Sequence, residues 1–141
     1  MGEVKSFRDL IAWQVGMRTV ELTYLLTSRL PDHERYGLTS QMRRAAVSIP
    51  SNLAEGQGVR ARRWTLRHIS TAIGSSCELD TQLEAAIRLR FVTTEQAKPL
   101  AESIDRVQKL LYGLRRKKEA SVAQAAATAG LVFLLFGQLL S

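Results

Sequence analysis

The most constraining feature of this chain is an apolar repeat that alternates steps of three and four residues and recurs in four segments. Such a repeat places its side chains on one face of an α-helix, whereas a half-buried strand requires strict alternation, which no segment shows convincingly. The segments cover about residues 8–28, 38–56 and 61–90, with a fourth that ends near residue 118. Four amphipathic helices joined by short loops predict an all-α, antiparallel, up-down-up-down four-helix bundle.

Two apolar stripes run along the first segment, which opens with a capping box of Ser6 and Asp9. The first stripe keeps the spacing of a bundle helix and consists of Leu10, Trp13, Met17, Val20 and Tyr24. The second stripe flanks it and consists of Ile11, Val15, Leu22 and Leu26. One core cannot easily cover both stripes. We therefore expect the first to face the core and the second to contact another subunit.

The second segment contains the stretch "RRAAVSIPSNLAEG", which combines an apolar stripe with a proline and several small polar residues. The stripe consists of Leu38, Met42, Ala45, Ile49 and Leu53. Pro50 predicts a kink, and the glycines at 56 and 58 predict the end of the helix. The remaining polar residues are expected to order a helix or subunit interface, with Glu78 of the third segment pairing with Arg43 or Arg44. These residues are Arg43, Arg44, Ser48, Ser51, Asn52, Glu55 and Glu78.

The third and fourth segments carry the longest apolar faces. Small residues at 74–76 should let a neighbouring helix approach the third segment closely. Thr93 and Gln96 form a second capping box, although Pro99 favours a helix start nearer Lys98. The inner face of the third segment consists of Leu66, Ile69, Ile73, Ser76, Leu79, Leu83 and Ile87. The seam of the fourth consists of Ala97, Leu100, Ile104, Val107, Leu111 and Leu114.

Composition changes abruptly after Glu119, because residues 120–141 contain no charged residue. We therefore divide the chain into a bundle domain, residues 1–118, and an alanine-rich apolar tail, residues 119–141. The densely apolar part, "LVFLLFGQLL", is too short to cross a bilayer. We expect the tail to pack on its own or a neighbouring subunit. A membrane anchor behind the basic "RRKK" is the alternative.

The sequence offers no catalytic or metal-binding motif. Cys77 is the only cysteine, which excludes an intrachain disulfide and a cysteine-rich zinc site and fits a cytoplasmic protein. His33 and His68 lie in different segments without metal-ligand spacing, and we expect them on a loop and on an outward helix face. No serine has a nucleophile motif. We expect a non-enzymatic protein without metal or cofactor.

The strongest functional feature is the basic stretch "VRARRWTLRH", in a chain whose formal net charge is +7 and whose pI is about 10.2. Arg63 and Arg67 lie one helical turn apart and could follow a phosphate backbone, and Trp64 could stack on an unpaired base. Further basic residues occur at 88–90 and 115–118. A solvated surface is the alternative for any single arginine. The predicted nucleic-acid-binding set is Arg60, Arg62, Arg63, Trp64 and Arg67.

Four stretches of the chain resemble a known family: "FRDLIAWQ", "ERYGLTSQMRRAAVSIPSNLAEG", "GSSCELDTQL" and "LLYGL". They are similar to the bacterial four helix bundle protein family, first met in intervening sequences of 23S ribosomal RNA genes and often labelled S23 ribosomal protein. The resemblance covers about residues 6–118 and implies an antiparallel four-helix bundle that assembles as a homopentamer. It implies no settled activity. Asp80 stands where the family prefers glutamate, and the tail lies outside the family pattern.

These observations favour a non-enzymatic, oligomeric, cytoplasmic protein that binds RNA or DNA through phosphates. The competing interpretation is a structural or protein-interaction module, an accessory partner of a larger assembly, without nucleic-acid binding. An enzyme is a distant third, because no convergent acid, base or nucleophile is visible.

Overall fold

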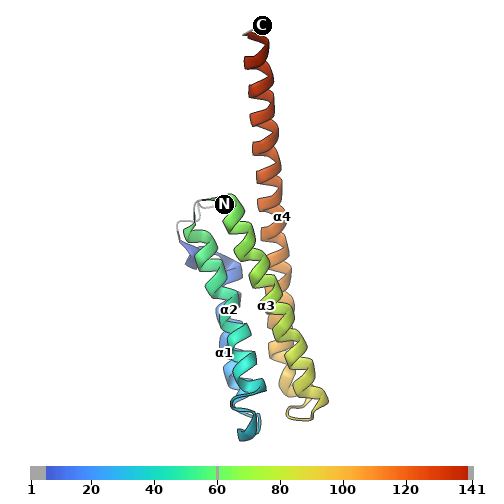
Figure 1. Ribbon diagram of the computed structural model, residues 1–141. Coiled ribbons are helices and arrows are strands. Elements are labelled where there is room, and N and C mark those ends of the chain that lie inside the picture. The colour runs from blue at the N-terminus through green and yellow to red at the C-terminus, as the bar shows by residue number, and fades with distance from the viewer. Residues whose placement is uncertain (1–5, 60, 140–141) are drawn as a thin grey trace.

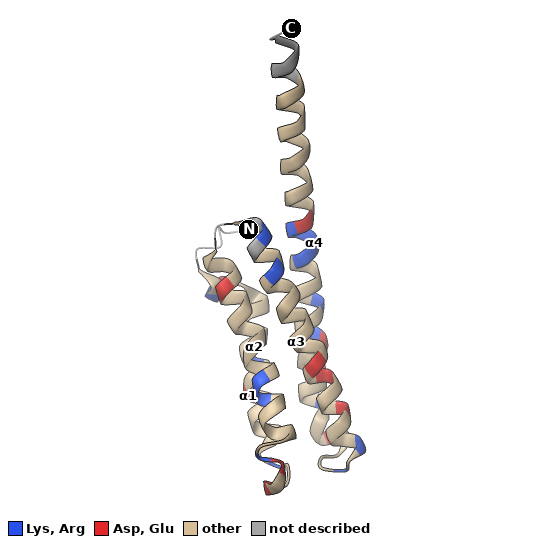
Figure 2. Ribbon diagram, viewed as in Figure 1, with Lys and Arg blue, Asp and Glu red and all other residues tan. Residues whose placement is uncertain are grey.

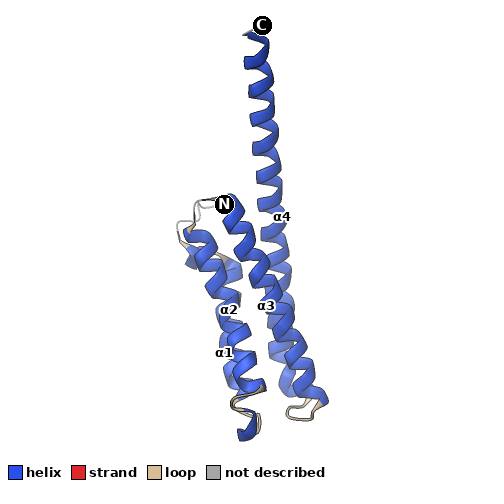
Figure 3. Ribbon diagram, in the orientation of Figure 1, coloured by secondary structure: helices blue, strands red, loops and turns tan. Residues whose placement is uncertain are grey.

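The computed structural model describes residues 6–59 and 61–139, except for the side chains of Arg62, Trp64 and residues 135–139. Over these residues the chain forms four α-helices and two short 3₁₀-helices and contains no strand, which confirms the all-α class (Figure 3). The elements in chain order are η1 (Phe7–Asp9), α1 (Ile11–Thr27), η2 (Asp32–Glu34), α2 (Leu38–Gly58), α3 (Arg62–Arg88) and α4 (Thr94–Leu139).

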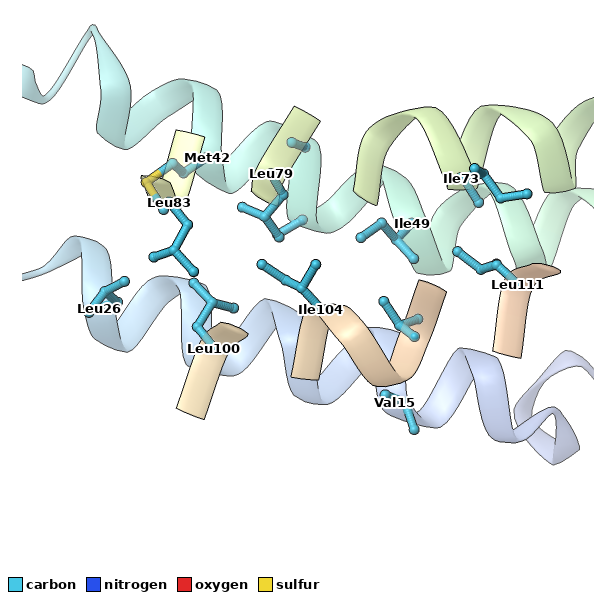
Figure 4. Packing of buried hydrophobic residues seen from close by; sticks show 14 of the residues in the cluster. Val15, Leu26, Met42, Ile49, Ile73, Leu79, Leu83, Leu100, Ile104 and Leu111 are labelled. Atoms are coloured by element: carbon cyan, nitrogen blue, oxygen red, sulfur yellow. The ribbon is translucent and has the colours of Figure 1, made fainter. Parts of the chain in front are cut away.

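The four helices surround one core. Each helix packs against the next one in the chain, and α4 also packs against α1 (Figure 1). Figure 4 shows side chains from all four helices meeting between them. The expected stripes of α2 and α4 are confirmed, since their members are buried except for Leu38 and Leu114, which pack at the edge. The largest fully buried apolar side chains are Met42, Ile49, Leu79, Leu100, Ile104, Val107 and Leu111.

The expected core face of the first helix is wrong in part, since Trp13 and Val20 pack against the core as expected but other members of the stripe do not. Met17 and Tyr24 are exposed, whereas Val15 and Leu26, which we assigned to another subunit, lie in the core. Threonines complete the buried face, which consists of Ala12, Val15, Thr19, Thr23, Leu26 and Thr27 together with Gly16. Burial of a hydroxyl is tolerated because each finds a partner. Thr19 and Thr23 donate to the carbonyls four residues earlier, at 2.9 and 2.7 Å.

A buried hydrogen bond links the first and last helices. The hydroxyls of Thr19 in α1 and Ser103 in α4 lie 2.8 Å apart, and both residues are buried. Two of the three small residues expected to allow close approach to α3, Ser75 and Ser76, are buried where α3 meets its neighbours. Gly74 faces outward, and a Cβ there would meet nothing within 4 Å.

The start of α4 follows the capping box rather than Pro99. The amide of Thr93 donates to Gln96 Oε1 at 2.9 Å, and the amide of Gln96 donates to Thr93 Oγ1 at 3.1 Å. The helix begins at Thr94, so the start expected nearer Lys98 is wrong. Pro99 lies on the exposed side of the helix, where water can bond the carbonyl that lacks its usual donor. Likewise, α2 continues through the buried Pro50 and ends at Gly58.

The last helix does not stop where the bundle stops. It continues well beyond the ends of α1, α2 and α3 as a single projecting helix (Figure 1). Residues 122–134 are all exposed, so the tail does not pack on its own bundle as one of our expectations had it. Across the residues that the structure describes, no helix is both long enough and apolar enough to span a bilayer.

Candidate nucleic-acid interface

The start of α3 is tied to the end of α2. The buried Thr65 hydroxyl donates to the carbonyl of Gly56 at 3.0 Å. Gly56 permits this approach, because a Cβ there would lie 3.0 Å from the Cβ of His68. The tie fixes the first turns of α3, so that Arg63 and Arg67, one turn apart, are both exposed to solvent.

A second basic group reaches the same end of the molecule from α4. Ile73 and Leu111 face each other in the core (Figure 4). From this pair, the start of α3 and the part of α4 that leads to the tail therefore lie toward the same end of the bundle. Figure 2 shows basic residues of both helices at that end. We call this surface the basic end. It consists of Arg63, Arg67, Arg115, Arg116, Lys117 and Lys118.

Positive charge dominates the basic end. Arg115, Arg116 and Lys117 are exposed, and Lys118 is half-buried. Arg115 Nε lies 2.8 Å from Glu119 Oε1, and the hydrogen bond and charge of that carboxylate raise the pKa of Arg115 above its ordinary value. The first turn of α3 contains no acidic residue. The positive end of the α3 dipole therefore adds to the side-chain charges.

Only part of the predicted binding set can be placed. Arg60 lies outside the described residues, as do the side chains of Arg62 and Trp64, so stacking by Trp64 stays a prediction. The "RLR" stretch at 88–90 does not join the basic end, because it lies at the opposite end of α3. Arg88 instead pairs with Glu84, with 2.6 Å between Nε and Oε1.

Several of the polar residues singled out in α2 form a network with α3. The hydroxyls of Ser48 and Ser75 lie 2.8 Å apart. Asn52 Nδ2 donates to the Ser48 carbonyl at 2.9 Å, and its Oδ1 lies 3.1 Å from His68 Nδ1. Glu55 Oε2 lies 3.6 Å from the same nitrogen. His68 is therefore partly covered between α2 and α3, rather than on the outward face where we expected it.

The expected ion pair of Glu78 with Arg43 or Arg44 is not formed among the described residues. Glu78 instead accepts a hydrogen bond from Gln82 Nε2 at 3.0 Å, one turn along its own helix. Arg43 turns toward α1, where its Nε donates to Thr27 Oγ1 at 2.9 Å and its guanidinium lies 4.5 Å from the Tyr24 ring centre. The helix geometry makes these nearer partners available without burying a charge pair.

Arg43 and Arg44 line a hollow that could not be predicted from the sequence, because its walls come from distant parts of the chain. Its volume is about 850 Å³. Tyr24, Asp32, Arg35 and Tyr36 from α1 and its following loop form one side, and Ser48, Ser75 and Glu78 form the other. Ser51 lies outside it and donates to the Val47 carbonyl at 2.8 Å.

The described residues contain no group of three or more histidine, cysteine or acidic side chains that could hold a metal ion.

The fold and the basic end together define the class of this protein: four helices around one core, with basic groups from distant parts of the chain meeting at one end. The chain belongs to the family of 23S rRNA-intervening sequence proteins, whose family model matches residues 8–113. The tail lies outside that match.

A solved structure supports the fold. It is a protein of unknown function from the S23 ribosomal protein family of Bacteroides thetaiotaomicron, 20% identical in sequence, with a TM-score of 0.69. The similarity covers 74% of this chain and 98% of the other. A comparison with curated proteins finds no match.

Proposed function

We propose that this protein binds RNA or DNA through the phosphates, using the basic end. The observation that carries the proposal is the meeting of Arg63 and Arg67 of α3 with residues 115–118 of α4 at one end of the bundle (Figure 2). Their side chains are exposed or half-buried, so the guanidinium and ammonium groups can reach a ligand. Phosphate contacts position a nucleic acid without reading its bases, so binding should show little sequence preference.

The salt dependence of binding tests this proposal. Each phosphate that a basic side chain neutralises releases condensed counterions, so log K should fall against log salt with a slope of ~0.7 to 0.9 per phosphate. Replacing Arg63 and Arg67 by alanine should make that slope shallower for RNA, single-stranded DNA and duplex DNA alike. Fluorescence anisotropy over a salt series measures it.

A matched control separates a local effect from a loss of net charge. Arg18→Ala with Arg88→Ala also removes two positive charges, from +7 to +5, but at sites away from the basic end. This control should keep the parent slope. Equal slopes for the parent and the Arg63/Arg67 variant would contradict the proposal. A protein-interaction module without nucleic-acid binding would then be the better interpretation.

We further propose that the bundle has the up-down-up-down order and that copies associate through their bundles into a closed ring, with a pentamer favoured. The short connections support the order. Exposed apolar side chains on α1 support association, namely Ile11, Met17, Tyr24 and Leu25. Sedimentation equilibrium of the chain without its tail tests the ring, and a monomer at micromolar concentration would contradict it.

A further inference from the structure

The tail helix, residues 120–139 of α4, contains no charged residue, and its side chains at 122–134 are uncovered. Residues 122–134 are all exposed, and Phe133 and Leu134 are 80% and 69% exposed. A surface helix normally presents a polar face to water, and a helix without one is stable when other chains or lipids surround it. The tail therefore requires a partner that α1, α2 and α3 do not provide.

The seam of α4 continues into the tail without a change of register. Steps of three and four lead from Leu111 and Leu114 through Lys118 and Ser121, and then to the residues we call the tail seam. The tail seam consists of Ala125, Thr128 and Val132. It lies on the same side of α4 that the other helices cover lower down, and with Ala129 and Phe133 it lines a shallow apolar groove.

The polar member of the tail seam is already suited to burial in a helix interface. The Thr128 hydroxyl donates to the Gln124 carbonyl at 2.9 Å. Thr19 and Thr23 make the same bond to the fourth preceding residue on the buried face of α1. Alanines at 125 and 129 are small enough to allow another helix to approach closely. These features favour another helix, whose backbone can approach the tail closely, over lipid as the partner.

We propose that the tail helices of separate copies of this chain pack against each other, in parallel, through the tail seam. The parallel direction follows from charge, because an antiparallel partner aligned on the tail seam, with position 125 against position 132, would place Lys118 of one copy level with the apolar Leu139 of the other. A parallel partner keeps apolar residues together. It adds a contact to the proposed assembly, and it holds whether or not the basic end binds nucleic acid.

Parallel packing has an electrostatic consequence that separates it from nucleic-acid binding. It draws the basic ends of the copies together, so their mutual repulsion opposes tail association. Added salt screens this repulsion and should strengthen tail association. The same salt should weaken nucleic-acid binding. The two proposals therefore predict opposite salt dependence and can fail independently.

Site-specific cross-linking of the full chain tests the proposal. Cys77, the only native cysteine, is exposed and would first be replaced by serine. In that background, Thr128→Cys should form an intermolecular disulfide readily on mild oxidation, because identical positions of a parallel seam face each other. Ala123→Cys on the opposite side of the helix is the matched control, and its yield should be several-fold lower. Equal yields, or no disulfide at either position, would overturn the proposal.

A charge placed on the seam gives a second readout. Ala125→Lys should weaken tail association about tenfold or more, since a lysine at a seam position buries an unpaired charge. Ala123→Lys adds the same charge to the outer side and should change association less than about twofold. Both are read by sedimentation of full chains. A membrane partner is tested by flotation of the parent chain with anionic lipid vesicles. If the parent floats with the vesicles and the Thr128→Cys variant forms no cross-link, the tail binds lipid and self-association is overturned.

Discussion

The two halves of α4 share one helix and one apolar spacing but have opposite surroundings. In residues 97–114 the seam is covered by the other helices, and Ile104, Val107 and Leu111 are at most 1% exposed. In residues 122–134 the same spacing continues, and every side chain is exposed. Periodicity therefore determines where the helix runs and which residues share a face, whereas burial depends on which other helices cover that face. The first half is part of the cooperative core, and the second half is an exposed surface that can serve as an interface.

Two leucine substitutions in α4 should show the largest contrast. Leu111→Ala removes a fully buried side chain and should lower the free energy of unfolding by about 2–5 kcal/mol, because it loses apolar burial and leaves a cavity. Leu134→Ala changes a side chain that is 69% exposed and should alter that free energy by less than about 0.5 kcal/mol. Urea denaturation followed by circular dichroism measures both. A large effect of Leu134→Ala would show that the tail is part of the core.

The helices and most of the core were predictable from the sequence, because spacing alone determines which residues share a face. The stripes of α2 and α4 and the second capping box follow directly from it. The face of α1 was not predictable from spacing, because Thr19 and Thr23 rank as polar in any apolar pattern. Only the structure shows their hydroxyls bonded within the helix.

The candidate site was predictable as composition but not as geometry. Basic residues at 63–67, 88–90 and 115–118 look equivalent in the sequence. Helix packing brings the first and third groups together and places the second at the other end (Figure 2). The partners of Arg43 likewise depend on how α1 crosses α2, which no local pattern encodes.

A pair of threonine substitutions should give an intermediate effect. Thr19→Val leaves the buried Ser103 hydroxyl without the partner that lies 2.8 Å away, and should cost about 1–3 kcal/mol of unfolding free energy. Thr128→Val removes a hydroxyl that donates to the carbonyl four residues earlier, as the Thr19 hydroxyl does, but in the exposed tail. This variant should lower the unfolding free energy by less than about 0.5 kcal/mol. The same urea titration applies. Similar costs for the two variants would erase the distinction between the halves.

A pair of glycine substitutions should give the smallest effect, and a favourable one. A Cβ at Gly74 or Gly130 would meet nothing within 4 Å. Alanine lowers the chain entropy lost on helix formation, so Gly74→Ala should stabilise the bundle by about 0.5–1 kcal/mol. Gly130→Ala should increase helicity in the tail without raising the midpoint of the bundle transition. Calorimetry combined with circular dichroism separates the two. A destabilised Gly74→Ala would indicate that a neighbouring subunit approaches that face.

The hydrogen bond between Thr19 and Ser103 has a kinetic consequence, because it joins residues 84 positions apart. The other helix pairs are neighbours in the chain, so their contacts close short loops and cost little entropy to form. We expect the helical hairpins to form before the transition state for folding and the contact of α1 with α4 to complete after it. Weakening that contact should then accelerate unfolding more than it slows refolding, which stopped-flow measurements on Thr19→Val would resolve. The lifetime of the folded chain is thus determined where its first and last helices meet.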